Sequence, residues 1–180
     1  MSKYHVDLLY ITLAAGCAVT GAVFDLKSRR IPNRLTFPAM LAGLLLHLVL
    51  NGLHGLGFAA ASGLIAGAIF AIFWIAGGMG AGDVKLMMAA GCIAGLDNVA
   101  WLLILTALAG GMMAIGLALW RGRLKDTLLN VGALAVHHRY EGLKPHPHLN
   151  VGNALTLRLP YGLAIAAGSI VTLCLTVVRR

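Results

Sequence analysis

Six apolar stretches, divided by short polar or glycine-rich segments, make up most of this chain. A helix needs roughly 20 apolar residues to cross a bilayer, with about 17 as the lower limit, and five of the stretches reach or approach that length. The remaining one, Val84–Leu96, is short and is either a tightly fitted span or a re-entrant segment. The pattern predicts membrane helices over Leu8–Phe24, Phe37–Leu53, Leu56–Ile75, Val84–Leu96, Val99–Trp120 and Pro160–Val178.

Composition supports the same class. Hydrophobic residues make up 59% of the chain and charged residues only 11%, whereas a soluble domain is about one quarter charged. This balance excludes an ordinary soluble domain and favours an all-α bundle in the lipid bilayer, over residues 1–180 as a single integral-membrane domain. The net charge of +8 does not indicate a nucleic-acid partner, because the basic residues cluster beside apolar segments, where they set orientation in a membrane.

The distribution of Lys and Arg decides between the two interpretations of Val84–Leu96. With six spans and an external N-terminus, eleven of the 14 basic residues lie on the cytoplasmic side and three outside. If the segment enters and returns, the later segments invert and the counts become seven and seven. The positive-inside rule therefore predicts six spans with both termini outside. The polar stretch 121–158 is then cytoplasmic, and its leucines are spaced as in a short amphipathic surface helix.

Neither the cysteines nor the histidines indicate a metal site, and no cofactor is predicted. Cys17, Cys92 and Cys174 lie inside apolar stretches without CxxC spacing, so we expect buried thiols. The histidines at positions 137, 138, 146 and 148 fall in the polar stretch without a cysteine, and we expect them to be solvated. His47, inside an apolar stretch, is expected to be packed and hydrogen-bonded.

Two of the six acidic residues stand at the ends of apolar stretches. Asp25 closes the first stretch, and Asp83 lies immediately before Val84–Leu96. An ionised carboxylate near a bilayer is costly, so such a residue points to function. In the six-span topology both reach the cytoplasmic face. Neighbouring carboxylates share a proton, so one can activate water while the other protonates a carbonyl oxygen, as in aspartic proteolysis. Asp7 and Asp97 are expected in or beside outer loops, with Asp7 capping the first helix.

The glycines are expected to serve two purposes. Glycine lets another backbone approach closely, so Gly80 and Gly82 are predicted to leave room for a peptide substrate beside the carboxylates. Lys85 is a further candidate for a substrate contact, against the ordinary interpretation that a lysine at the end of a span extends to the interface. A helix-packing surface is the expected role of Gly63, Gly67, Gly77, Gly78, Gly91 and Gly95.

These segments resemble the prepilin peptidases, membrane aspartic proteases that process type IV pilins. Gly80-Ala81-Gly82-Asp83 is similar to the family's GxGD segment, and Asp25 followed by Ile31-Pro32-Asn33 is similar to its first catalytic segment. Leu159-Pro160-Tyr161-Gly162 resembles the Pro-aromatic-Gly element that opens the last span in relatives. The compact form resembles the peptidases of tight-adherence (Flp) pilus systems, and archaeal preflagellin peptidases are a second relative.

The resemblance implies that Asp25 and Asp83 are the catalytic pair of an aspartic endopeptidase in the bacterial inner membrane. The family cleaves a positively charged leader after a glycine at the cytoplasmic face, so prepilins or pseudopilins are the expected substrates and the pilus assembly machinery an expected partner. Larger members carry paired CxxC motifs and methylate the new N-terminus. No such motif is present here, and no methyltransferase activity is expected.

Two alternatives stay open at this stage. One is an ion-coupled transporter, which also holds intramembrane carboxylates, although transporters usually have repeated halves and acids near the midplane. The other is a non-catalytic assembly subunit of a secretion machine, which would not depend on both carboxylates.

Overall fold

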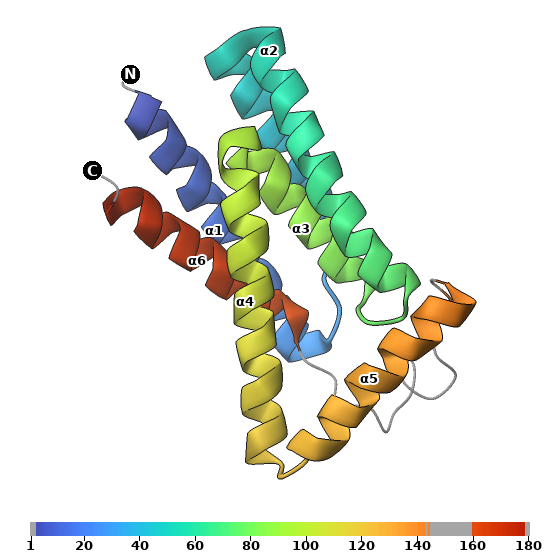
Figure 1. Cartoon of the computed structure of the whole chain (residues 1–180). Coiled ribbons are helices and arrows are strands. Elements are labelled where there is room, and N and C mark those ends of the chain that lie inside the picture. The colour runs from blue at the N-terminus through green and yellow to red at the C-terminus, as the bar shows by residue number, and fades with distance from the viewer. Residues whose placement is uncertain (1–2, 143, 145–159, 179–180) are drawn as a thin grey trace.

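A computed structural model of the chain describes residues 3–142, 144 and 160–178. Within these ranges the chain forms helices joined by short connections and contains no strand, as the apolar stretches predicted. Figure 1 shows α3 enclosed by longer helices, with α5 set apart from them. The helices are α1 (Lys3–Ser28), α2 (Asn33–Ile75), α3 (Ala81–Ala94), α4 (Leu96–Trp120), α5 (Leu124–Glu141) and α6 (Tyr161–Val178).

The long helix α2 is bent into two limbs at Gly52. The backbone there has φ 65° and ψ −159°, a conformation that interrupts the helix and that glycine adopts without a steric penalty. Contacts with α3 show that the first limb runs parallel to α3 and the second antiparallel, as the reversal in Figure 1 also shows. The pairs are Asn33 with Lys85 and His47 with Ile93 before the bend, and Ser62 with Gly91 and Gly67 with Met88 after it.

Small residues bring α3 close to both limbs of α2. A Cβ added at Gly63 would collide with the sulfur of Cys92, and one added at Gly91 would come within 2.9 Å of the Ala66 side chain. The hydroxyl of Ser62 donates a 2.7 Å hydrogen bond to the Gly91 carbonyl at the same contact. The predicted packing roles of Gly63, Gly67 and Gly91 are therefore confirmed.

The remaining long helices place the chain termini at one end of the bundle and both aspartates at the other. Near the aspartate end, Gly21 of α1 faces Leu86, in the second turn of α3. Near the opposite end, Tyr10 of α1 stacks on His47. The start of α6 contacts the end of α1, and Figure 1 shows the N- and C-termini close together at the far end.

Among the described residues, four helices have the length and composition to cross a membrane, and they lie within α1, α2, α4 and α6. α3 has 14 residues and rises roughly 21 Å, which is less than the hydrocarbon thickness of about 30 Å. α2 has 43 residues, and its bend divides them into limbs that match the predicted stretches Phe37–Leu53 and Leu56–Ile75. Six spans with external termini stay a prediction.

The predictions for Cys174 and Asp7 are wrong. Cys174 is exposed rather than buried, because it lies on the outward side of α6, whereas Cys17 and Cys92 are buried as expected. Asp7 does not cap the first helix, because α1 already begins at Lys3 and Asp7 lies inside it. Asp97 lies in the first turn of α4.

The predicted helix in the polar stretch is present as α5. Gly122, with φ 65°, turns the chain out of α4, and α5 begins two residues later. His146 and His148 lie outside the described residues. Among the described residues, no group of three His, Cys, Asp or Glu side chains is arranged to hold a metal ion.

Candidate active site

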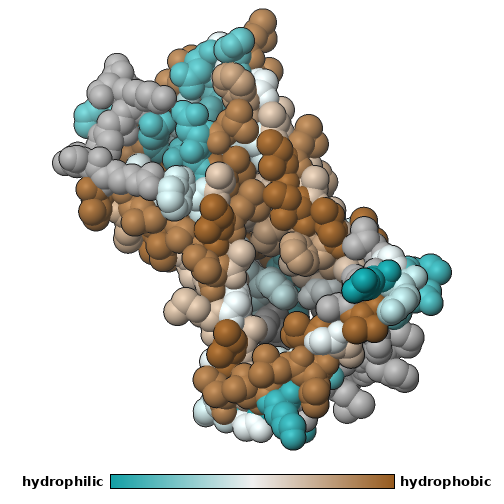
Figure 2. All heavy atoms as spheres, in the orientation of Figure 1, coloured by the Kyte–Doolittle hydropathy of each residue, from teal (hydrophilic) through white to brown (hydrophobic). Residues whose placement is uncertain are grey.

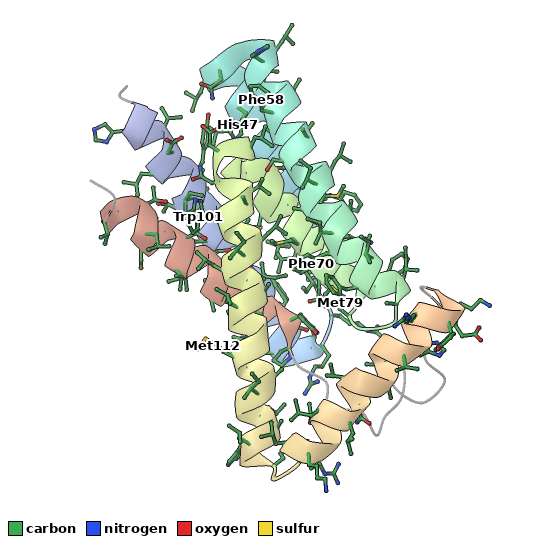
Figure 3. All side chains as sticks on the ribbon, viewed as in Figure 1. His47, Phe58, Phe70, Met79, Trp101 and Met112 are labelled. Atoms are coloured by element: carbon green, nitrogen blue, oxygen red, sulfur yellow. The ribbon has the colours of Figure 1, made fainter. Side chains whose placement is uncertain are left out.

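The segments singled out in the sequence meet at the end of the bundle opposite the termini. Asp25 comes from the last turns of α1 and Asp83 from the first turn of α3, and each side chain is 9% exposed. Beneath them lies an apolar core in which Phe70 and Met79, labelled in Figure 3, are buried. Both carboxylates therefore lie in the protein interior rather than in an open loop.

The start of α6 holds Asp25 in place. The backbone N–H of Gly162 donates a hydrogen bond of 3.1 Å to Oδ2 of Asp25. A Cβ added at Gly162 would lie 3.0 Å from the Asp25 Cβ and 3.1 Å from the Ala22 Cα, distances that are tighter than almost all real contacts. Glycine at this position is what allows α6 to approach α1 closely enough for the bond to form.

Asp83 caps its own helix. It is the third residue of α3, and its Oδ2 accepts a 3.1 Å hydrogen bond from the backbone N–H of Gly80, the N-cap residue. Asp83 lies outside the four candidate spans, and its pKa is raised to about 6. Burial is the largest cause, the negative charge of Asp25 also raises the pKa, and the Gly80 hydrogen bond lowers it. The two aspartates therefore interact electrostatically, which the predicted topology permitted.

The connection between α1 and α2 packs on the start of α3. Ile31 covers Gly82, where an added Cβ would lie 3.2 Å from the Ile31 Cβ. Asn33 begins α2, and its side-chain oxygen accepts a 3.0 Å hydrogen bond from the Lys85 ammonium. The ammonium also lies 5.8 Å from the centre of the Phe37 ring. Lys85 thus links α3 to α2, and Gly80 and Gly82 stay partly exposed.

Gly77 and Gly78 end α2 rather than forming a packing surface. Gly77 has φ 79°, and its N–H bonds to the Trp74 carbonyl while the Gly78 N–H bonds to the Phe73 carbonyl. This is the Schellman pattern, which satisfies the last carbonyls of a helix. The packing role expected from the sequence is wrong for these two residues, because a capping glycine and a packing glycine look alike in a sequence.

The surface is hollowed at the aspartate end. Figure 2 shows a hollow between α4, α5 and the body of the bundle, with more hydrophilic atoms inside it than on the brown surfaces around it. In Figure 1 the starts of α2 and α6 lie behind this hollow.

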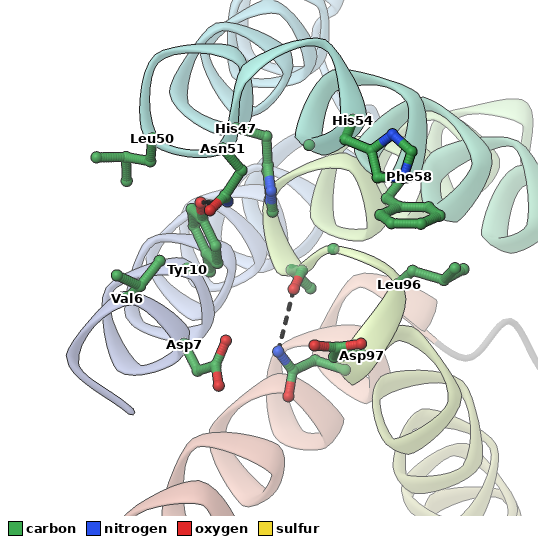
Figure 4. A pocket seen from close by; sticks show the side chains of 14 residues that line it. Val6, Asp7, Tyr10, His47, Leu50, Asn51, His54, Phe58, Leu96 and Asp97 are labelled. Carbon is green, nitrogen blue, oxygen red and sulfur yellow. Dashed lines mark hydrogen bonds between the residues drawn. The ribbon is translucent and has the colours of Figure 1, made fainter. Parts of the chain in front are cut away.

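A cavity of about 690 Å³ lies at the opposite end of the bundle (Figure 4). Asp7, Tyr10, His47 and Asp97 are among its lining residues. His47 is 5% exposed, stacks on Tyr10 with ring centres 3.8 Å apart, and bonds to the Ile93 carbonyl, so the packed role predicted for it is confirmed. This cavity is remote from Asp25 and Asp83.

Comparison with known proteins now places the chain. Residues 12–115 match the model of a family described as the type IV leader peptidase family. The chain belongs to that family. The matched segment includes Asp25, Asp83 and the connection between α1 and α2, and it ends before Gly162. Membership in this family, together with four apolar helices of spanning length, makes the chain a membrane protein.

Curated relatives support the same assignment. The chain is 32% identical over 141 residues to a prepilin leader peptidase/N-methyltransferase of Aeromonas hydrophila. The aligned segment covers 74% of this chain and 43% of the relative. It is 34% identical over 113 residues to the protein of the same name from Burkholderia pseudomallei (strain 1026b), covering 58% of this chain and 35% of that protein. The chain thus spans less than half the length of the curated relatives it matches. No solved structure matches it.

In the sequence, Gly162 stands out only as part of the Pro-aromatic-Gly motif, which assigns it no role. The structure shows that its backbone holds Asp25, and that its neighbour Tyr161 is close enough to Asp83 to interact electrostatically. The available signal was a glycine directly after Pro160 and Tyr161 at the start of an apolar stretch. Such a position suits a close helix contact, but the sequence does not show which helix it contacts.

Proposed function

We propose that the chain is an aspartic endopeptidase that removes the leader peptide of type IV or Flp-type prepilins. One observation supports this more than any other. In a member of the type IV leader peptidase family, two buried aspartates from different helices lie at the same end of the bundle, and the charge of one raises the pKa of the other. Aspartic proteolysis needs two neighbouring carboxyl groups that can share one proton, and such a pair can supply them.

In the proposed mechanism the two carboxyl groups share one proton and titrate as a pair. Asp83 holds the proton, because burial and the Asp25 charge both favour its neutral form. Asp25, fixed by the Gly162 N–H, takes a proton from water as the water attacks the carbonyl carbon before the scissile bond. Asp83 protonates the carbonyl oxygen. The tetrahedral intermediate then collapses, and the leaving amine receives a proton from the pair.

The substrate of this reaction is proposed to enter through the hollow between α4 and α5 (Figure 2). Its extended backbone lies along the partly exposed Gly80 and Gly82, and cleavage follows a glycine at the cytoplasmic face of the inner membrane. We propose that residues 1–180 act as one membrane domain that delivers processed pilin to the assembly machinery. The absence of methyltransferase activity stays an expectation based on the lack of a CxxC motif.

Leader removal tests this proposal. The chain is expressed with a Flp-type prepilin, and processing is followed by gel shift and mass spectrometry. Asp25→Asn and Asp83→Asn should each abolish cleavage while membrane insertion is unchanged. Asp97→Asn is the matched control, because it makes the same substitution in a helix at the opposite end, and it should leave cleavage intact. Normal processing in either of the first two variants would contradict the catalytic pair.

The arrangement of the carboxylates does not favour the alternatives. A transporter would place its acids along a path near the membrane midplane. Asp25 and Asp83 instead share one end of the bundle. An assembly subunit without catalysis would process no prepilin at all, so the same experiment separates it from the peptidase.

A further inference from the structure

Helix α5 carries a broad apolar face that the bundle does not cover. Among the described residues its main contact is with α4, at the turn where the two helices meet. Tyr140 is 81% exposed and Leu129 63% exposed. Exposed surfaces rarely show large apolar side chains in such a row, so the face has a partner that the described residues do not supply. The exposed apolar residues of α5 are Leu128, Leu129, Val131, Val136 and Tyr140.

Two basic residues lie within this apolar face. At 3.6 residues per turn, Leu128, Leu129, Val136 and Tyr140 fall within roughly 120° of arc, and the positions of Lys125 and Arg139 lie between them. Both basic side chains are exposed. Lys and Arg bury their aliphatic stems in apolar surroundings while their charged ends reach water or headgroups. A basic pair flanked by leucines and a tyrosine suits the region where acyl chains meet phosphates.

The opposite side of α5 has a different character. Asn130, His137 and Glu141 share it, and the ammonium of Lys144 lies 3.6 Å from the Glu141 carboxylate. The His137 ring bonds to the Lys144 carbonyl. The Glu141 carboxylate is therefore paired, and its position lies on the side of α5 away from Lys125 and Arg139. The charge pattern favours an anionic partner for the apolar face over a neutral or cationic one.

The turn before α5 continues the same surface. Trp120, the last residue of α4, is 84% exposed, and Arg121 and Arg123 on the turn are exposed as well. Tryptophan is enriched where membrane helices leave the hydrocarbon region, and basic residues next to a span attract anionic lipids. The surface formed by this turn and the apolar face of α5 is continuous with a helix of membrane-spanning length.

We propose that α5 lies in the membrane interface and binds anionic phospholipid, with Lys125 and Arg139 on the lipid phosphates and the flanking apolar side chains among the acyl chains. The binding is independent of the catalytic proposal, because none of these residues is Asp25, Asp83 or one of their contacts. It fixes α5 beside the hollow at the aspartate end (Figure 2).

The test uses the full chain in lipid nanodiscs of phosphatidylcholine, with and without added phosphatidylglycerol. An NBD label is attached at Tyr140→Cys on the apolar face, or at Asn130→Cys on the polar face, in a Cys174→Ser background. We expect the label at position 140 to shift to the blue and to be quenched by iodide about fivefold less in discs containing phosphatidylglycerol. The label at position 130 should be quenched equally in both discs.

Charge variants complete the test. Lys125→Gln with Arg139→Gln should remove the difference between the two kinds of disc, whereas Lys144→Gln, which removes one charge from the paired polar side, should preserve it. High salt should reduce the difference. The proposal is overturned if position 140 is equally quenched in both discs. Protection that appears only when a prepilin peptide or more protein is added would overturn it too, because the apolar face would then belong to a protein partner.

Discussion

The backbone N–H of Gly162 donates its hydrogen bond to Asp25 across 137 positions of the chain. The contact joins the first turn of the last helix to the end of the first helix, and both are needed to complete the aspartate end. α3, which carries Asp83, contacts α1 more extensively than it contacts α6. The geometry around Asp25 therefore depends on a helix that comes from the far end of the sequence.

Gly162→Ala should reduce leader cleavage. The added methyl would lie against Asp25 and Ala22, so α6 must move and the hydrogen bond to the carboxylate lengthens. Loss of a bond to a charged group costs about 1.5 to 3 kcal/mol, which corresponds to a fall of roughly 10- to 100-fold in kcat/KM. The change in kcat/KM is measured by steady-state cleavage of a prepilin in detergent. Gly116→Ala, where the added methyl meets open space, is the control, and equal rates in the two variants would contradict a positioning role.

The stability of the protein should depend on pH through Asp83. Its pKa is raised from 3.8 to about 6, so between these values the unfolded chain releases a proton that the folded protein keeps. Stability is therefore lost as the pH rises through this window, by about 3 kcal/mol at most. The effect is measured by thermal unfolding in detergent between pH 4 and 7.5, for the wild type and for Asp83→Asn. The melting temperature of the wild type should fall relative to that of Asp83→Asn as the pH rises through the window.

Asp25→Asn provides the internal check on that experiment. It removes the neighbouring charge, which is the second cause of the raised pKa, so the upper end of the window should move to lower pH. A pH profile of stability that is the same for wild type and Asp83→Asn would show that Asp83 is not held in this environment.

Lys85 and Asn33 should be energetically coupled. Their hydrogen bond joins α3 to α2, so Lys85→Met and Asn33→Ala should destabilise the folded protein by similar amounts. The double variant should destabilise it by less than the sum of the two single effects. Because the pair is exposed, the coupling should be about 0.5 to 1 kcal/mol. Unfolding in detergent measures the free energies of the wild type, the two single variants and the double variant. The KM for a prepilin substrate is measured in parallel. A rise in KM for Lys85→Met alone would instead assign the ammonium to the substrate.

Gly63→Ala should destabilise the contact between α2 and α3. The added methyl collides with the Cys92 sulfur inside a closely packed interface, and overpacking of this kind costs about 1 to 3 kcal/mol. Gly57→Ala lies in the same limb with open space around it, and it should be neutral or slightly stabilising. The melting temperatures of Gly63→Ala and Gly57→Ala are compared in detergent. A similar fall in melting temperature for both variants would show that the loss of a glycine in the helix backbone, and not the contact with Cys92, causes the effect.

The sequence predicted the aspartate end well, for a physical reason. Counting spans and basic residues brings the end of the first stretch and the start of the fourth to one face, and Asp25 and Asp83 do interact in the structure. Glycines four residues apart correctly indicated close packing at Gly63 and Gly67. These predictions depend on periodicity and charge, which the sequence carries directly.

Other features could not be predicted from the sequence. The Gly162 donor is a backbone group, and every residue except proline carries one, so the sequence does not mark it. Cys174 was expected to be buried, but in a membrane protein the lipid-facing and core-facing sides of a helix are equally apolar, and hydropathy does not separate them. Gly77 was misassigned because its left-handed conformation depends on where α2 ends.

The shortness of α3 bears on where the proposed catalytic pair lies along the bundle. The side chains of Leu86, Met87, Ala89 and Ala90 have no exposed surface, so α3 contacts protein along much of its length and need not match the thickness of the lipid. It is 12 residues shorter than α1, with 14 residues against 26, a difference of roughly 18 Å in rise. Asp83, at the start of this short helix, lies level with Ile31 in the connection between α1 and α2, so the proposed reaction takes place at that end of the bundle and not at its middle.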